Sequence, residues 1–273
     1  MELKIYQQEA LNTLTSFCKN YKESSGKVEE AFNNTLKNSE QFSEPYEPYL
    51  KVKESTAPYI CIRIPTGGGK TLIAAKSLKP VIEELYENDK TFLVIWLAPK
   101  DIIVNQTIKA LKNPKHPYRK AIDEDFPSTS INVMKLKDAL TNTFNKKTDI
   151  TILVGSMQSF NVGNDDIRKF YYLNSNYANF LENSKYKDEP SLANAIKEAS
   201  PYIIIDEAHK ARANLSLSNI INLNPSFVLE LTATPERNHK PNSGKYASNI
   251  IYSVSASQLK AENMIKLPII LET

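Results

Sequence analysis

Residues 59–71 have the sequence YICIRIPTGGGKT, in which an apolar run leads into three consecutive glycines followed by Lys70 and Thr71. The chain has only 7 glycines in 273 residues, so overall composition does not explain a run of three. Glycine lets backbone N–H groups approach an anion without a Cβ atom in the way, and a helix that begins here adds its positive end. The stretch therefore predicts a strand, a phosphate-binding loop and a helix.

The spacing assigns roles within this loop. Lys70 would contact the β- and γ-phosphates of ATP, and the Thr71 hydroxyl would bind Mg²⁺. The strict pattern G-x-x-x-x-G-K-[ST] has its first glycine where this chain has Ile64. A turn that merely contains three glycines is the alternative, but Gly-Lys-Thr between a strand and a helix favours the phosphate loop. The residues expected to hold ATP here are Thr66, Gly67, Gly68, Gly69, Lys70 and Thr71.

Four further apolar runs predict strands at residues 92–97, 150–154, 202–205 and 227–231. They are nearly continuous rather than alternating, which is typical of strands buried on both faces of a parallel sheet. Helical spacing occurs between them, as in Ile103, Thr107 and Leu111, and again in Leu192, Ile196 and Ala199. The sequence therefore predicts an α/β fold with a mainly parallel sheet and helices on both faces.

Two adjacent carboxylates, Asp206 and Glu207, follow the predicted strand at residues 202–205. Ligands of open α/β sheets bind at the carboxyl ends of the strands. Asp206 is suited to hold Mg²⁺ through water, and Glu207 to orient and deprotonate the attacking water. Such a pair is elsewhere often a solvated helix start, but the apolar run before it favours a catalytic pair. His209 alone is more typical of a local hydrogen bond, and with His116 and His239 it has no metal-ligand spacing, so we predict no zinc site.

Two hydroxyl residues, Thr232 and Thr234, end the last predicted strand. They could hydrogen-bond toward the carboxylate pair. Thr-Ala-Thr alone is weak evidence for a functional motif, but its place after the glycine loop and the carboxylates strengthens that interpretation.

The composition excludes several classes of protein. With 41% hydrophobic and 24% charged residues, the chain is typical of a soluble globular protein. A net charge of +3 is too small to indicate nucleic-acid binding alone. Two distant cysteines make no disulfide framework, which fits a cytoplasmic location. There is no signal-peptide pattern and no apolar run near the roughly 20 residues that span a bilayer, so we expect no membrane partner.

Three polar segments are expected to be additions to the sheet. Residues 19–57 would contain one short helix, built on Val28, Phe32 and Leu36. Residues 112–130 contain three prolines and are expected to form a surface loop in which the acidic residues 123–125 are solvated. Residues 161–190 are expected to include a helix near 166–181.

Aromatic and basic residues alternate in this last segment, which could stack bases and bind a nucleic-acid backbone. The basic residues are Arg168, Lys169, Lys185 and Lys187. We favour the alternative, that Phe170, Tyr171 and Phe180 pack the segment onto the rest of the fold.

Taken in order, the motifs resemble those of the first RecA-like domain of superfamily 2 helicases and translocases. The resemblance covers about residues 1–18 and 58–271. The matching stretches are 6–11 (the Tyr-Gln-x-x-Ala element), 65–71 (motif I, which in this superfamily accepts a residue such as Ile64), 98–100 (motif Ia), 155–160 (a nucleic-acid-contacting motif), 206–209 (Asp-Glu-Ala-His, motif II) and 232–234 (motif III).

The resemblance implies further roles. Gln7, or alternatively Gln8, would recognise adenine, and His209, Thr232 and Thr234 would couple hydrolysis to movement. It also implies that the motif III strand lies between the motif I and motif II strands. The residues implied to contact the nucleic-acid backbone are Pro99, Lys100, Ser156, Gln158 and Ser159.

A narrower resemblance is to the Res subunit of type III restriction enzymes. It is carried by residues 254–256 and 264–269 and by the long polar insertions. It implies DNA as a partner, with a second RecA-like domain in the same full-length chain and a methyltransferase or specificity subunit as further partners.

Too few residues follow Pro235 for a second domain, which needs on the order of 100–150 residues. We therefore expect residues 1–273 to form a single RecA-like ATP-binding domain, with the second RecA-like domain and any nuclease domain outside it. Such a chain would bind Mg-ATP but hydrolyse it poorly. The alternatives are an ATP-gated nucleic-acid clamp without turnover, and a fragment of a DNA-repair or RNA helicase.

Overall fold

The fold is built on one parallel sheet. The computed structural model describes residues 2–37, 57–86, 92–144, 150–156, 165–206, 220, 222–236, 247–262 and 264. Within these ranges the strands lie in the order β3-β4-β2-β5-β6-β1-β7, and each neighbouring pair is parallel. They are β1 (Tyr59–Arg63), β2 (Phe92–Ala98), β3 (Ile131–Lys135), β4 (Ile150–Ser156), β5 (Tyr202–Asp206), β6 (Phe227–Thr232) and β7 (Ile250–Ser253).

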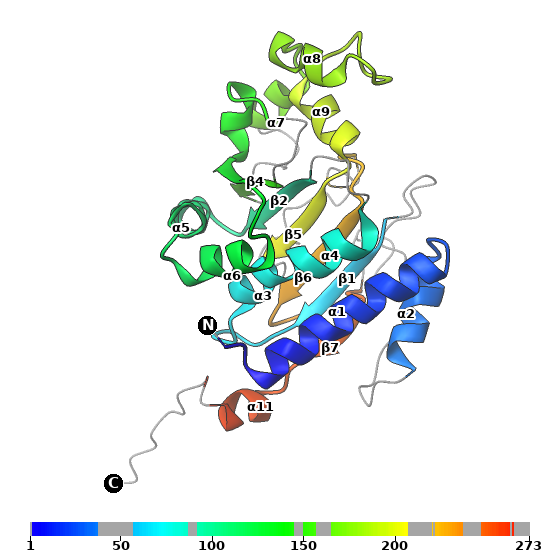
Figure 1. Ribbon diagram of the computed structural model, residues 1–273, viewed down its shortest axis with the longest axis vertical. Helices are drawn as coiled ribbons and strands as arrows, with labels where there is room; N and C mark the ends of the chain where they lie inside the picture. Colours follow the sequence, from blue (N-terminus) through cyan, green and yellow to red (C-terminus); the bar gives the residue numbers. More distant parts are fainter. Residues whose placement is uncertain are drawn as a thin grey trace.

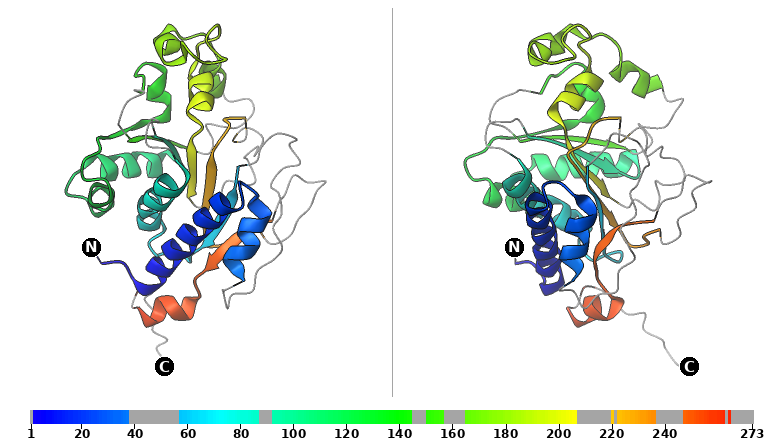
Figure 2. Two further views of the ribbon diagram at one scale, coloured as in Figure 1. Left: turned by 45° about the vertical axis from the view of Figure 1, so that its right-hand side comes forward. Right: turned by 90° about the vertical axis from the view of Figure 1, so that its right-hand side faces the viewer.

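Helices lie on both sides of this sheet, which confirms the predicted α/β fold with a parallel sheet covered on both faces (Figures 1 and 2). The helix α11 and the group α7 to α9 lie at opposite ends of the molecule. The helices are α1 (Ile5–Glu23), α2 (Val28–Leu36), α3 (Lys70–Lys76), α4 (Leu78–Leu85), α5 (Asp101–Lys112), α6 (Pro117–Asp125), η1 (Leu136–Leu140), α7 (Asp165–Phe170), η3 (Ser175–Tyr177), α8 (Ala178–Leu181), α9 (Leu192–Ala199) and α11 (Ala256–Ala261). None of the helices in the described ranges is both long and apolar enough to cross a membrane.

Each face of the sheet buries its own apolar layer. Ile62, Trp96 and Ile204 belong to the layer that packs against α1 and α3 to α6. Ile95 and Ile203, which alternate with them along the strands, belong to the layer beneath η1 and α7 to α9. Because both faces are covered, the central strands are apolar at most positions, with buried exceptions such as Thr151 of β4 and Glu230 of β6. This agrees with the nearly continuous apolar runs of the sequence.

The five predicted strands are confirmed as β1, β2, β4, β5 and β6, with ends shifted by one or two residues. The predicted place of β6, between β1 and β5, is also confirmed. The outer strands β3 and β7 are not among the predicted ones. In β3 only Ile131 and Val133 are buried, and an alternating strand of five residues gives a weaker signal than a continuous apolar run.

Two predictions about the polar segments are wrong. The segment predicted at residues 19–57 begins later, because α1 continues to Glu23. Its predicted short helix is confirmed as α2, and residues 38–56 lie outside the described ranges. The segment at residues 112–130 is not a surface loop throughout, because Pro117 begins α6. A proline is favourable in the first turn of a helix, and the imidazole of His116 accepts a hydrogen bond from the Tyr118 N–H at 3.2 Å.

In the third segment, the short helices α7, η3 and α8 replace the single helix expected near residues 166–181. Phe170 and Phe180 are buried, as predicted. Tyr171 is 47% exposed, so the prediction that it packs inward is wrong. Tyr172 and Leu173 are exposed as well.

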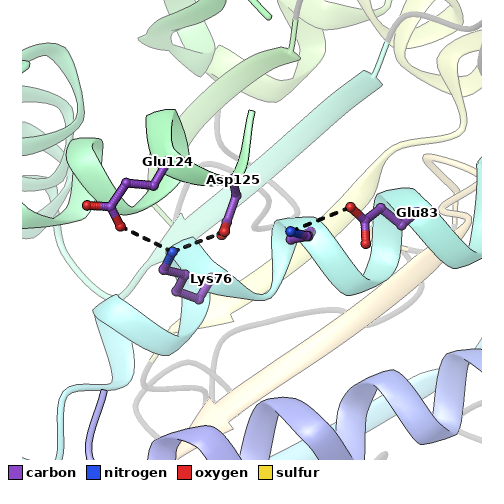
Figure 3. A network of polar contacts seen from close by, with 5 residues as sticks. Lys76, Glu83, Glu124 and Asp125 are labelled. Atoms are coloured by element: carbon purple, nitrogen blue, oxygen red, sulfur yellow. Dashed lines mark hydrogen bonds and ion pairs between the residues drawn. The ribbon is translucent and has the colours of Figure 1, made fainter. Parts of the chain in front are cut away.

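Lys76, the last residue of α3, joins α3 to α6 (Figure 3). Its Nζ lies 3.1 Å from Asp125 Oδ1 and 3.6 Å from Glu124 Oε2. The Lys76 and Asp125 side chains are only 15% and 13% exposed. The prediction of a solvated loop at residues 123–125 is therefore wrong: these residues end α6, where Asp123 pairs with Arg119 of the same helix, and Glu124 and Asp125 join α6 to α3.

We expect Lys76→Met to lower the free energy of unfolding by about 1–3 kcal/mol, because it leaves the shielded Asp125 carboxylate without its cation. Urea denaturation measures this loss. The control is Lys79→Met, which removes the exposed Lys79–Glu83 ion pair and should cost less than about 0.5 kcal/mol. Equal losses in the two variants would contradict a structural role for the Lys76 pair.

Candidate functional site

The glycine loop connects β1 to α3. Just beyond β1, the Ile64 N–H donates to the Thr232 carbonyl at 2.9 Å, so the loop leaves the sheet beside the end of β6. Gly67 and Gly69 have φ angles of +85° and +76°, and Gly69 is the residue before α3. Positive φ turns the chain sharply and is readily adopted only by glycine. The predicted strand, loop and helix are therefore confirmed.

The loop is also too crowded for side chains. A Cβ atom on Gly68 would lie 2.5 Å from Ile64 Cγ2, and one on Gly69 would lie 2.5 Å from Gln7 Nε2. Ile64, which stands where the strict pattern has glycine, is fully buried beneath the loop. The departure from the pattern is thus accommodated, because Ile64 fills the space that a side chain at position 68 would need.

The first turn of α1 contacts this loop. The Tyr6 hydroxyl donates to the Gly68 carbonyl at 2.8 Å, and Gln7 Nε2 donates to the same oxygen at 3.3 Å. Gln7 Oε1 accepts from the Lys4 N–H at 3.0 Å, so both ends of its amide are held. Gln8 is exposed, and its amide donates to Asn12. Of the two glutamines named from the sequence, Gln7 is the one at the loop, whereas sequence reasoning assigned no role to Tyr6.

Lys70 is buried within the loop. Its Nζ donates to the carbonyls of Ile64 and Pro65 at 3.3 and 3.5 Å. The ammonium group therefore lies on the inner side of the turn that the glycines make. A phosphate oxygen in this turn would offer it a charged acceptor, which makes a stronger hydrogen bond than a carbonyl does.

Asp206 ends β5, two strands away from the loop. The register pairs Asp206 with Leu231 of β6, and Thr232 of β6 with Arg63 of β1. Asp206 is 5% exposed and stands two residues after Ile204 in β5, and Ile204 belongs to the layer packed by α3. Because side chains alternate between faces, Asp206 lies on the α3 face of the sheet.

The two threonines differ in their surroundings. The Thr232 hydroxyl accepts from the Thr234 N–H at 3.2 Å, and Thr232 is buried whereas Thr234 is exposed. Thr232 alternates with Leu231 of the α3 layer and so lies on the face opposite Asp206. Arg63, which the sequence did not single out, donates to the Ala233 carbonyl and to Ser253 Oγ. Glu207 and His209 lie outside the described residues.

Three of the five predicted nucleic-acid residues, Pro99, Lys100 and Ser156, lie at the same edge of the sheet. Pro99 and the exposed Lys100 follow β2, whose last residue pairs in register with Ser156 of β4. Ser156 is only 4% exposed, so its hydroxyl presents little surface to a phosphate. Gln158 and Ser159 lie outside the described residues. Lys135 at the end of neighbouring β3, which the sequence did not single out, donates to Asn105 Oδ1 at 3.3 Å.

Residues 1–237 match the sequence model of a family described as the Res subunit of type III restriction enzymes. The chain belongs to this family. A comparison with curated proteins found no match.

Three solved structures are among those similar to this Res-family chain. A nuclease-deletion mutant of the type ISP restriction-modification enzyme LlaGI, in complex with a DNA substrate mimic, is 15% identical, with 97% of this chain and 21% of that chain covered and a TM-score of 0.48. The type ISP enzyme LlaBIII bound to DNA is 16% identical, with 96% and 16% covered and a TM-score of 0.47. The UvsW helicase from bacteriophage T4 is 18% identical, with 81% and 66% covered and a TM-score of 0.35. The Res-family chain thus spans about a fifth or less of the two restriction enzymes.

The donor atoms at this site fit Mg²⁺. This ion prefers oxygen ligands and is usually bound through one or two protein groups, several waters and substrate phosphates. The Thr71 hydroxyl in the first turn of α3 and the Asp206 carboxylate are groups of this kind. In the described ranges of the Res-family chain, no three His, Cys, Asp or Glu residues gather into a metal-binding group. An ion held by Thr71 and Asp206 would therefore need phosphate oxygens of the nucleotide, and water, as its remaining ligands.

We expect Gly69→Ala to weaken binding of a fluorescent adenine nucleotide by the Res-family chain at least tenfold, because the new Cβ would displace Gln7 and strain the turn. The matched control is Gly26→Ala. Gly26 also has positive φ, at +83°, but a Cβ there would lie 3.6 Å from the nearest atom, Tyr21 Oη. This control should lose about 1–2 kcal/mol of stability and keep its affinity. Unchanged affinity in Gly69→Ala would exclude crowding at this loop as the reason for the glycine.

Proposed function

We propose that this chain is the ATP-binding half of an ATP-dependent DNA translocase or helicase motor from a restriction-modification enzyme. One observation carries the proposal: a side-chain-free glycine turn encloses Lys70, while Tyr6 and Gln7 hold it from α1. Two of the remaining groups needed for nucleotide chemistry, Asp206 and Thr232, end the next two strands along the sheet. Membership of the Res family supports this assignment.

Each group has a role in this proposal. Backbone N–H groups of residues 66–69 and Lys70 bind the phosphates, while Thr71 and Asp206 hold Mg²⁺. Glu207 deprotonates the attacking water, and Gln7 recognises adenine. His209, Thr232 and Thr234 couple hydrolysis to movement.

We further propose that efficient turnover needs a second RecA-like domain that supplies an arginine to the transition state. Such an arginine is worth roughly 10³–10⁵ in rate, or about 4–7 kcal/mol. Residues 1–273 alone would then bind Mg-ATP and hydrolyse it slowly. In this proposal residues 1–273 are one RecA-like domain, and cleavage and site recognition belong to a nuclease domain and a methyltransferase or specificity subunit.

The DNA backbone would cross the carboxyl ends of β2 and β4. Lys100 is exposed there and bears a full positive charge, so it is the strongest candidate for a phosphate contact. Such contacts position the protein on DNA without reading its sequence.

We expect Lys70→Ala to abolish binding of Mg-ATP by the 273-residue chain, because the phosphates lose the only side-chain cation proposed for them. Calorimetric titration measures this, with Lys79→Ala as a control of equal charge change on the exposed face of α4.

In the full-length enzyme, Glu207→Gln should bind ATP but not hydrolyse it. Binding that survives Lys70→Ala would refute the nucleotide site, and turnover that survives Glu207→Gln would refute the base.

We expect Lys100→Glu to weaken DNA binding and to flatten its salt dependence, with the slope of log K against log salt reduced by about 1. Fluorescence anisotropy with a labelled duplex at several salt concentrations tests this. The control replaces Arg168, Lys169, Lys185 and Lys187 together by Glu, and should leave the affinity nearly unchanged. A larger loss in this control would move the DNA path onto the α7–α9 segment.

A further inference from the structure

Helix α1 has only a partial cap of its own: Gln7 Oε1 accepts from the Lys4 N–H, but no side chain of its first turn accepts from the N–H groups of Ile5 and Tyr6. The residue before it, Lys4, has no side-chain acceptor, and no acidic residue lies in its first turn. The first N–H groups of a helix have no partner within the helix and need one from elsewhere. In this fold the partner comes from the far end of the chain: Glu262 Oε2 accepts from the Ile5 N–H at 3.1 Å, and Oε1 accepts from the Tyr6 N–H at 3.2 Å.

Glu262 is held in place by its own turn. It follows α11, which lies beside the start of α1 (Figure 1). The Ser255 hydroxyl accepts from the Gln258 N–H, while Gln258 Oε1 accepts from the Ser255 N–H at 2.8 Å. The Glu262 N–H donates to the Gln258 carbonyl at 3.2 Å. A helix closed at both ends therefore presents this carboxylate to α1.

The same segment lies beside the glycine loop, as the space around Gly67 and Gly68 shows. Leu259 Cδ2 lies 3.3 Å from the position of a Cβ on Gly68, and the Met264 carbonyl lies 3.8 Å from one on Gly67. The loop is thus enclosed between α1 on one side and the α11 segment on the other. Glu262 is the polar link that joins these two walls.

The charge of Glu262 acts on the residues that hold the loop. Two hydrogen bonds to one carboxylate, placed at the positive end of a 19-residue helix, are both charge-assisted. Burial, and after it the negative charge of Glu262, raise the pKa of Tyr6. A tyrosine is already protonated at physiological pH, so Tyr6 is a donor to the Gly68 carbonyl there, and the raised pKa extends this to more alkaline pH.

We propose that Glu262 is a positioning residue for nucleotide recognition: it clamps the first turn of α1, and with it Tyr6 and Gln7, onto the glycine loop. The clamp makes adenine recognition depend on α11. The inference rests on the proposed function, because it assumes that the loop binds ATP and that Gln7 recognises adenine.

The test compares binding of ATP, GTP and inorganic tripolyphosphate to the 273-residue chain by calorimetry. We expect Glu262→Ala to weaken ATP binding about tenfold and to reduce the preference for ATP over GTP, while tripolyphosphate binding changes less. Glu262→Gln keeps one acceptor oxygen and should restore much of the preference for ATP. If Glu262→Ala does not fold, Glu262→Gln carries the test, since it should still show a smaller preference than the wild-type chain.

The control is Tyr252→Phe. The Tyr252 hydroxyl donates to Glu9 Oε2 at 2.6 Å, so this variant also frees α1 from a distant partner, but at Glu9 instead of at the Ile5 and Tyr6 N–H groups. It should lose stability and keep the ATP preference.

Three outcomes would overturn the inference: an unchanged ATP preference in both Glu262 variants, an equal loss of preference in Tyr252→Phe, or a wild-type chain that binds ATP and GTP equally. A wild-type chain whose ATP binding is absent, or unaffected by Lys70→Ala, would instead refute the proposed function itself.

Discussion

The carbonyl oxygen of Gly68 is the point on which the site depends. It accepts hydrogen bonds from both Tyr6 and Gln7, and this is possible only because α1 approaches the loop more closely than a side chain would allow. The same closeness leaves no room for a Cβ atom at position 69, where it would meet Gln7, whereas a Cβ atom at position 68 would meet Ile64 beneath the loop. Two positive φ angles in the loop reinforce the requirement for glycine. The glycines are therefore required by the packing around the loop, including its contact with α1, apart from any role in the proposed binding of phosphate.

Parallel pairing supplies the second constraint. Carboxyl ends of parallel strands meet at one edge, so residues far apart in the sequence become neighbours without any direct bond between them. The order β5-β6-β1 brings Asp206, Thr232 and the glycine loop together, while β2 and β4 carry Lys100 and Ser156 along the same edge. The pleat then separates them by face, with Asp206 on the side of α3 and Thr232 on the other.

Helices outside the motifs stabilise this arrangement. Lys76 ties α6 to α3 through the shielded Asp125, so a segment with a loop-like composition becomes part of the support behind the phosphate loop. Its three prolines suggest a loop, but Pro117 occupies the first turn of a helix, where proline is favourable. The exposed run from Tyr171 to Leu173 shows the converse, since aromatic residues that suggest packing remain at the surface.

The sequence by itself determined the five central strands, the glycine loop and the order of the motifs. These features are local: continuous apolar runs follow from burial on both faces, and consecutive glycines follow from a turn without room for side chains. Only the tertiary structure decided which glutamine contacts the loop, that Tyr6 joins it, and that Glu262 caps α1. Those contacts link positions up to 257 residues apart, and no local pattern encodes them. The residues around Glu262 in the sequence would be the same whether its carboxylate faced solvent or capped a distant helix.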